Sequence, residues 1–323
     1  MARKISIALF LGLILLAAGC GRPSMRKVRI GMVTFPGYAP FYLAKDKGLF
    51  QGVDVDLVRI EAIGDLRAAM KSGNIDMYLA TFDIFESNQG EIPPGVGFLA
   101  VDQSNGADGV AVAGGIDSVS DFKGKRVGAE PGFPPYFVLQ YALHEAGMSL
   151  KDVQFRDIAS QDAGSAFVAK QLDVVGTYEP YLSKSVSLRK GSRVLVSSAN
   201  LPGLVVDLLF ASEKLLDETP EVAQEVAKGW FSAVQYYQRH PDESMELMAK
   251  SFGVSTQELA DMKSRLLWFS LEDNSKLFDA KQHQNVFNTF DVVGEILQSN
   301  NPSFVNMKAR DKLSSEIINR LGK

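Results

Sequence analysis

Four acidic residues lie where predicted β-strands end or begin, and their carboxylates are the groups in this chain best placed to hold a small molecule. They are Asp83, Asp108, Glu179 and Asp207, and the loops that carry them contain no Lys or Arg. Ligands of open α/β sheets bind outside the carboxyl ends of the strands. We therefore predict a binding site built from Tyr38, Thr81, Phe82, Asp83, Asn105, Asp108, Phe133, Tyr136, Glu179 and Asp207.

The chemistry of these residue types favours a ligand that carries a cationic or hydrogen-donating nitrogen. Carboxylates edged by Tyr and Phe suit an ammonium, an amidine or an amino-bearing heterocycle, through ion pairing and cation–π contact. A desolvated sulfonate or nitrate would favour an Arg clamp or a helix N-terminus. Predicted helix N-termini near Gly37–Tyr38 and Phe133–Pro134 could accept an anionic end, so a zwitterion remains open.

Each predicted site residue also has an ordinary structural use. Aromatic side chains often pack in cores, which is the alternative for Tyr38, Phe82 and Tyr136. Helix caps and first turns favour acids, which is the alternative for Asp83 and Glu179. Hydrogen bonding at a connection between domains is the alternative for Asp108 and Asp207. Strand-end loops are nevertheless enriched in functional residues.

The elements that must position these loops alternate along the chain. The run KVRIGMVTF reads as a strand and APFYLAKDKGLF as a helix, and the alternation restarts after Gly115. Beyond Ser212 the sequence is nearly all helical, with a break at His240–Pro241, an amphipathic stretch over 279–299 and a last helix over 309–321. The pattern predicts an α/β fold of two units with largely parallel sheets, followed by a helical C-terminal region.

Composition excludes several classes of function. The net charge of -4 and a pI near 5.6 give no basic surface for nucleic acid. Cys20 is the only cysteine, so neither a disulfide nor a cysteine metal site can form. The three histidines are scattered along the chain, at His144, His240 and His283. We predict no metal site and no cofactor.

The first twenty residues indicate export from the cytoplasm. Arg3–Lys4 precede the apolar run ISIALFLGLILLAAG and then Cys20. The run is short for a membrane span, and small residues precede the cysteine. We predict a lipoprotein signal peptide over 1–20 ending at a lipidated Cys20, with a polar tether over 21–26. A membrane anchor or a simple cleaved signal is the alternative.

Several segments resemble one family of transport proteins. They are FPGYAPFYLAKDKGLF, MKSGNIDMYLAT, VSDFKGKRVGAEPGFPPYFVLQYALHEAGMSLKDVQF and AKQLDVVGTYEPYL, which together cover most of 27–211. In order and spacing they resemble the nitrate/sulfonate/taurine (NitT/TauT, SsuA/THI5-like) binding proteins of ABC importers. That group also includes binders of thiamine precursors.

The resemblance implies a type II periplasmic-binding-protein fold, in which two α/β lobes joined by two crossing segments hold the ligand between them. Lobe one would comprise 27–108 plus 206–323, and lobe two 109–205. The expected partners are a small-molecule ligand and the permease and ATPase subunits of an importer. We expect a monomer at the cell envelope, anchored to the membrane by its lipid and facing the periplasm or the cell exterior.

Three other functions remain as alternatives. The ligand could be nitrate, a sulfonate, taurine or a thiamine precursor. The chain could be an extracytoplasmic sensor component. An enzyme on the same fold is the third, but the chain has no Ser/His/Asp order, no Gly-rich phosphate loop and no HExxH motif. We therefore predict a binding protein and not an enzyme.

Overall fold

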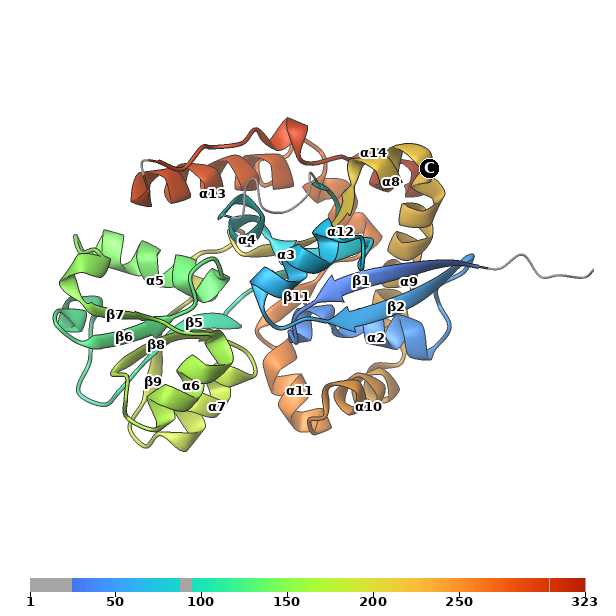
Figure 1. Ribbon diagram of the computed structural model, residues 1–323. Coiled ribbons are helices and arrows are strands. Elements are labelled where there is room, and N and C mark those ends of the chain that lie inside the picture. Colours follow the sequence, from blue (N-terminus) through green and yellow to red (C-terminus); the bar gives the residue numbers. More distant parts are fainter. Residues whose placement is uncertain (1–24, 88–94, 302, 323) are drawn as a thin grey trace, which may run out of the picture.

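The chain forms two β-sheets, each flanked by helices (Figure 1). The computed structural model describes residues 25–87, 95–301 and 303–322. The strands are β1 (Arg26–Met32), β2 (Val53–Arg59), β3 (Met77–Thr81), β4 (Gly95–Ser104), β5 (Asp108–Val112), β6 (Arg126–Ala129), β7 (Gln154–Asp157), β8 (Val174–Tyr178), β9 (Arg193–Ser197), β10 (Val206–Ser212) and β11 (Leu266–Trp268). One sheet has the order β11-β4-β10-β3-β1-β2 and the other β7-β6-β8-β5-β9. The described chain is thus a mixed α/β protein, as the sequence predicts.

Helices cover both faces of each sheet. They are α2 (Ala39–Asp46), α3 (Ile63–Lys71), α4 (Phe82–Ser87), α5 (Pro134–Glu145), α6 (Ser160–Val168), α7 (Tyr181–Leu188), α8 (Glu213–Glu218), α9 (Pro220–Arg239), α10 (Pro241–Phe252), α11 (Thr256–Lys263), α12 (Leu271–Leu277), α13 (Val286–Asn300) and α14 (Glu316–Leu321). In the five-stranded unit, α5 lies on one face while α6 and α7 lie on the other (Figure 1). In the six-stranded unit α2 packs on α9, where Phe41 meets Trp230 at a ring-centroid distance of 4.8 Å.

The chain passes between the two sheets twice. Residues 105–107 connect β4 to β5, and residues 198–205 connect β9 to β10. The two connections are bonded to each other, because the Ser198 hydroxyl lies 2.7 Å from the Ser104 hydroxyl and accepts the Gly106 N–H at 2.7 Å. These contacts bring residues about a hundred positions apart to one place between the sheets.

The prediction of largely parallel sheets is wrong in part. Parallel pairs form between β1 and β2, β1 and β3, β6 and β7, and β6 and β8. The pairs β10–β3, β10–β4, β11–β4, β5–β8 and β5–β9 are antiparallel. Strands β5 and β10 take part in four of these five pairs. Each arrives from the other unit without a crossover helix within its own sheet, so it can pair in either direction.

The C-terminal region also differs from its sequence pattern. Helix α13 begins only at Val286, because the Asn285 side chain accepts the Asn288 N–H at 2.9 Å and caps the helix there. The expected helix over 309–321 divides into a 3₁₀ turn, Ala309–Asp311, and α14. Strand β11 lies within the region expected to be helical and extends the edge of the six-stranded sheet. None of the helices in the described ranges is long and apolar enough to cross a membrane.

Candidate ligand-binding site

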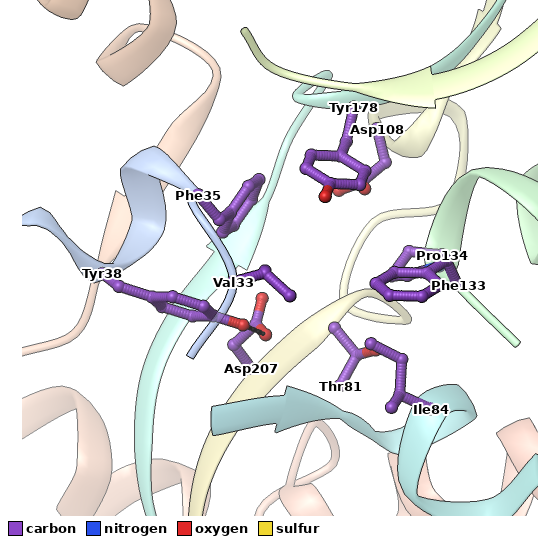
Figure 2. Close-up of a pocket in the computed structure, with 10 residues that line it drawn as sticks. All are labelled: Val33, Phe35, Tyr38, Thr81, Ile84, Asp108, Phe133, Pro134, Tyr178 and Asp207. Atoms are coloured by element: carbon purple, nitrogen blue, oxygen red, sulfur yellow. Dashed lines mark hydrogen bonds between the residues drawn. The ribbon is translucent and has the colours of Figure 1, made fainter. Parts of the chain in front are cut away.

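A narrow cavity lies between the two sheets (Figure 2). Both units contribute to its wall, and the residues that line it in the described chain include no Lys or Arg. The lining residues are Val33, Phe35, Tyr38, Thr81, Ile84, Asp108, Phe133, Pro134, Tyr178 and Asp207. The enclosed space is about 20 Å³, which is room for about one water molecule, so an organic ligand would fit only after the walls had moved apart.

Cross-strand pairing places the polar groups of the cavity. Asp207 of β10 lies opposite Thr81 of β3 on one side and opposite Asp102 of β4 on the other. In the second sheet, Asp108 of β5 lies opposite Tyr178 of β8. Strands β3, β5 and β8 are buried along their whole length. Each sheet therefore presents a carboxyl group to the cavity from a rigid, solvent-shielded position.

Aromatic rings from both units form the walls. The rings of Phe35 and Tyr178 meet edge to face across the two units, with centroids 6.1 Å apart. Phe133, just before α5, stacks on Tyr178 at 6.1 Å and an interplanar angle of 15°. Figure 2 shows these rings around the space that Asp108 and Asp207 face. This arrangement offers π faces and carboxylates together, which is the environment that organic cations favour.

The turn after β1 holds Tyr38 against Asp207. The turn is a 3₁₀ helix, Pro36–Tyr38, and the Tyr38 hydroxyl donates to Asp207 Oδ1 at 2.5 Å. The turn lies close to the next carboxyl group of the sheet, since a Cβ on Gly37 would collide with Asp102 Oδ2. Gly37 therefore lets the backbone approach the acids closely enough for Tyr38 to reach Asp207.

The acids around the cavity are buried and incompletely hydrogen-bonded. Asp108 is 3% exposed and its Oδ2 has no hydrogen-bond partner in the described chain. Burial raises the pKa of Asp108 to about 7, and the charges of Asp83 and Glu179 add to the rise while Ser104 opposes it. Burial also raises the pKa of Asp207 well above its ordinary value, although the Tyr38 hydroxyl lowers it. These carboxyls favour a state in which a proton or a cation compensates their charge.

Asp102 is the most extreme member of the group. Its residue is fully buried, and neither of its carboxylate oxygens has a hydrogen-bond partner among the described residues. Burial raises its pKa well above the ordinary value, and the charges of Asp207 and Asp108 raise it further while Lys263 lowers it. Asp102 is not among the residues that line the cavity, and it lies opposite Asp207 on the neighbouring strand β4.

The structure brings half of the predicted site residues to the cavity. Those in the lining are Tyr38, Thr81, Asp108, Phe133 and Asp207. The others lie outside it. They are Phe82, which packs on Phe290; Asp83, which is buried in the first turn of α4; Asn105, whose N–H donates to Arg265; Tyr136, which packs on Phe155; and Glu179, which pairs with Arg265.

Sequence reasoning missed several residues that the structure adds. Phe35, Pro134 and Tyr178 line the cavity and belong to the same strand-end loops as the predicted residues. Their signal was the aromatic or proline type at a strand end. Val33 and Ile84 gave no signal, because an aliphatic residue near a strand end is usually core. Asp102 carried a signal in the run GFLAVDQS, since an acid inside an apolar strand requires a partner or a proton.

The N-terminus of α5 faces the cavity but offers no free backbone donor. Its first two residues, Pro134 and Pro135, lack N–H groups, and the N–H groups of Tyr136 and Phe137 both bond to the Phe133 carbonyl. A helix N-terminus binds anions through such free N–H groups.

In the described residues no group of three or more His, Cys, Asp or Glu is arranged to hold a metal ion.

Comparison with known proteins places the chain in a family. Residues 36–244 match the family described as NMT1/THI5 like. A candidate binding protein of Brucella abortus is 26% identical over 239 residues, which are 72% of this chain and 73% of that protein. A candidate aliphatic sulfonates-binding protein of Bacillus subtilis is 26% identical over 263 residues, 76% of this chain and 77% of the relative.

Solved structures share the fold. The aliphatic sulphonate binding protein SsuA of Escherichia coli superposes with a TM-score of 0.72 at 22% identity, over 90% of this chain and 92% of that one. The alkanesulfonate-binding SsuA of Xanthomonas axonopodis, solved with MOPS, gives 0.72 at 18% identity over 89% and 98%. These likenesses show that the chain shares the fold of these binding proteins.

The chain belongs to the NMT1/THI5-like family. The predicted resemblance and the predicted fold class are confirmed. The prediction of a binding protein in place of an enzyme is also confirmed, since the relatives are binding proteins.

Proposed function

We propose that this chain is the solute-binding lipoprotein of an ABC importer and that it encloses its ligand between two lobes. Lobe one comprises 27–108 plus 206–323, and lobe two comprises 109–205. The lobes turn about residues 105–107 and 198–205, the two connections between the sheets. Closure couples binding to a shape that the permease and its ATPase subunits can recognise. The chain acts as a monomer in this role.

The proposed ligand is a small organic molecule with a cationic or hydrogen-donating nitrogen. The observation that carries this proposal is buried Asp108, whose Oδ2 has no hydrogen-bond partner among the described residues. Asp108 lines a cavity walled by aromatic rings, and the described lining includes no Lys or Arg. A bound cation would compensate Asp108 and Asp207 and lie against the faces of Phe133 and Tyr178. The space between the units is smaller than such a ligand, so the lobes would have to open to admit it.

A sulfonate is the second candidate, because the Bacillus subtilis relative carries that specificity in its description. The geometry of this chain disfavours it. The α5 N-terminus has no free N–H toward the cavity, and the nearest charged groups are acids. A sulfonate would therefore require Asp108 and Asp207 to be protonated donors, a state that the raised pKa of Asp207 permits but that leaves no fixed positive charge to pair with the anion.

A thermal-shift panel distinguishes the two candidates. The probes are benzamidine, agmatine, cytosine, arginine, taurine, ethanesulfonate and nitrate. A ligand at a hundred times its Kd stabilises the folded protein by about 2.7 kcal/mol, so even a micromolar binder raises the Tm. We expect a nitrogenous probe to bind and the Asp108→Asn variant to weaken it by about 1–3 kcal/mol. The matched control is Asp54→Asn, an exposed carboxylate on β2.

Two results would count against the nitrogenous ligand. One is a Tm increase with taurine or ethanesulfonate and none with the cations. The other is a cation that binds Asp108→Asn as tightly as the parent. Either result leaves the transport role intact, because specificity depends on a few side chains and not on the scaffold.

The lipid anchor is part of the proposal. It rests on Arg3–Lys4, the apolar run and Cys20 in the sequence, which lie outside the described residues. An acylated cysteine supplies the several buried chains that stable anchoring needs. The Cys20→Ala variant should appear in the soluble fraction or remain unprocessed. Recovery of this variant at mature size in the membrane fraction would show that Cys20 is not the anchor.

A further inference from the structure

An ion pair joins the two units next to their first connection. Arg265, just before β11 in the six-stranded unit, donates to Glu179, just after β8 in the five-stranded unit. The Glu179 side chain is fully buried and that of Arg265 is 38% exposed. Ser183 completes the contact, since its hydroxyl donates to Glu179 Oε1 at 2.6 Å and accepts from Arg265 at 3.1 Å. The carboxylate side of the contact is therefore shielded from water, while the guanidinium is partly exposed.

The backbone ties both partners to the same connection. The Asn105 N–H donates to the Arg265 carbonyl at 2.8 Å, and the Glu179 N–H donates to the Ala107 carbonyl at 2.9 Å. Gly106 lies between the two bonded residues and has a φ of 110°, a conformation that side-chain-bearing residues rarely adopt. A backbone rotation at Gly106 would therefore move Arg265 away from Glu179. A change in the angle between the units would therefore break the ion pair.

The same pair affects the cavity through Asp108. The charge of Glu179 raises the pKa of Asp108, which follows Gly106 by two residues. Arg265 lowers the pKa of Glu179, against the effect of burial. Arg265 thus compensates an acid that would otherwise oppose the ionised form of a cavity residue, although it does not line the cavity itself.

We propose that Arg265 and Glu179 form a latch that stabilises the closed arrangement of the two units, with Arg265 acting as a positioning residue for ligand capture. The inference rests on the proposed function, because it assumes closure around a ligand. Ligand affinity falls with the fraction of protein in the binding-competent state. Loss of the latch should therefore weaken every ligand by the same factor, whereas a change in the cavity wall acts on each ligand differently.

The test measures the distance between the units in ligand-free protein. Spin labels are placed on cysteines introduced at Lys71 and Lys190, two exposed positions in different units, in the full chain carrying Cys20→Ser. Pulsed electron–electron double resonance then gives the distribution of distances between the two labels. We expect Arg265→Gln to increase the open population relative to the closed one by about five- to tenfold, between the effects of exposed and buried pairs.

Three further variants complete the experiment. Arg265→Gln/Glu179→Gln removes the buried unpaired charge, so it tests the latch even if the single variant folds poorly. Arg265→Lys keeps the charge and should restore part of the closed population. The control is Arg126→Gln, which breaks an ion pair with Asp173 at 2.7 Å inside the five-stranded unit and should leave the distances unchanged.

The outcomes separate the latch from the proposed function. A larger open population in Arg265→Gln and in the double variant, with none in Arg126→Gln, supports the latch. Distance distributions that coincide in the parent and the double variant overturn it. Failure of the ligand proposal appears elsewhere, as the absence of any stabilising probe for the parent chain in the thermal-shift panel.

Discussion

Replacing Asp108 with Asn should stabilise the ligand-free protein at alkaline pH while weakening the binding of a cationic ligand. Asp108 is 3% exposed, and one of its carboxylate oxygens has no hydrogen-bond partner in the described chain. Its side chain is therefore kept at a cost in stability, as ligand-binding groups often are. Asn has nearly the same shape and no charge, so the substitution isolates the electrostatic cost.

The sign of the effect follows from the direction of the pKa change. Burial raises the pKa of Asp108 from 3.8 to about 7, so folding takes up a proton between these pH values. A group with a raised carboxyl pKa destabilises the folded state increasingly as the pH rises from about 4 to about 7, and by a constant amount above that. The free energy of unfolding of the parent should thus decrease over this range.

The magnitude follows from the same values. Each pKa unit corresponds to about 1.4 kcal/mol, so a rise from 3.8 to about 7 corresponds to roughly 4 kcal/mol at pH 8. Local relaxation and water entry reduce such costs, and we expect Asp108→Asn to raise the free energy of unfolding by about 2–4 kcal/mol at pH 8. At pH 4 the Asp108 carboxyl is protonated in the folded parent and about half ionised in the unfolded chain, so the difference should be only about 0.5 kcal/mol.

Urea unfolding tests this prediction, because it gives the free energy of unfolding, with the fluorescence of Trp230 and Trp268 as the signal. Parent and variant are compared at pH 4 and pH 8, and exposed Asp54→Asn is the control. A variant no more stable than the parent at pH 8 would refute the argument. A gain of equal size at both pH values would also refute it, because improved packing and not lost charge would then be the cause.

Three other substitutions follow from the site. Gly37→Ala should lower the free energy of unfolding by about 1–3 kcal/mol, and with it the Tm, because the added Cβ would meet Asp102. A calorimetric Tm equal to that of the parent would contradict this. Tyr38→Phe removes the hydroxyl that donates to Asp207 and should lower the free energy of unfolding, measured in urea, by about 1–2 kcal/mol. A free energy of unfolding equal to that of the parent would contradict this. Phe133→Ala should weaken the binding of benzamidine by about 0.5–1.5 kcal/mol, because the ligand loses contact with the ring face. Equal affinity of parent and variant in calorimetry would show that the Phe133 ring does not contact the ligand.

Local sequence patterns predicted most of the architecture. Strands such as 95–104 and helices such as 134–145 follow from runs of apolar residues and from proline and glycine at their ends. The short strand Leu266–Trp268 did not follow, because three residues carry too little periodicity to distinguish a strand from a helical segment. The direction of strand pairing at the two connections was also outside local patterns, since it depends on how the sheets meet.

The candidate site was predictable to the extent that it lies at strand ends. Asp108 and Asp207 line the cavity because each begins or nearly begins a buried strand, a position visible in the sequence. Glu179 occupies an equivalent position by the same argument, at the end of β8. Its partner Arg265 is 86 residues away, so no local pattern could indicate that this acid pairs with a cation.

The sequence by itself determined the class of the fold, the acids at the strand ends and the scarcity of bases beside them, because these features depend on residue type and on periods of a few residues. The tertiary structure decided which acids share the cavity and which are compensated elsewhere. Asp207 accepts a hydrogen bond from Tyr38, and Glu179 forms an ion pair with Arg265. Asp102 has no hydrogen-bond partner among the described residues. The charge that a ligand meets depends on these long-range pairings, since burial and neighbouring charges set the state of each carboxyl.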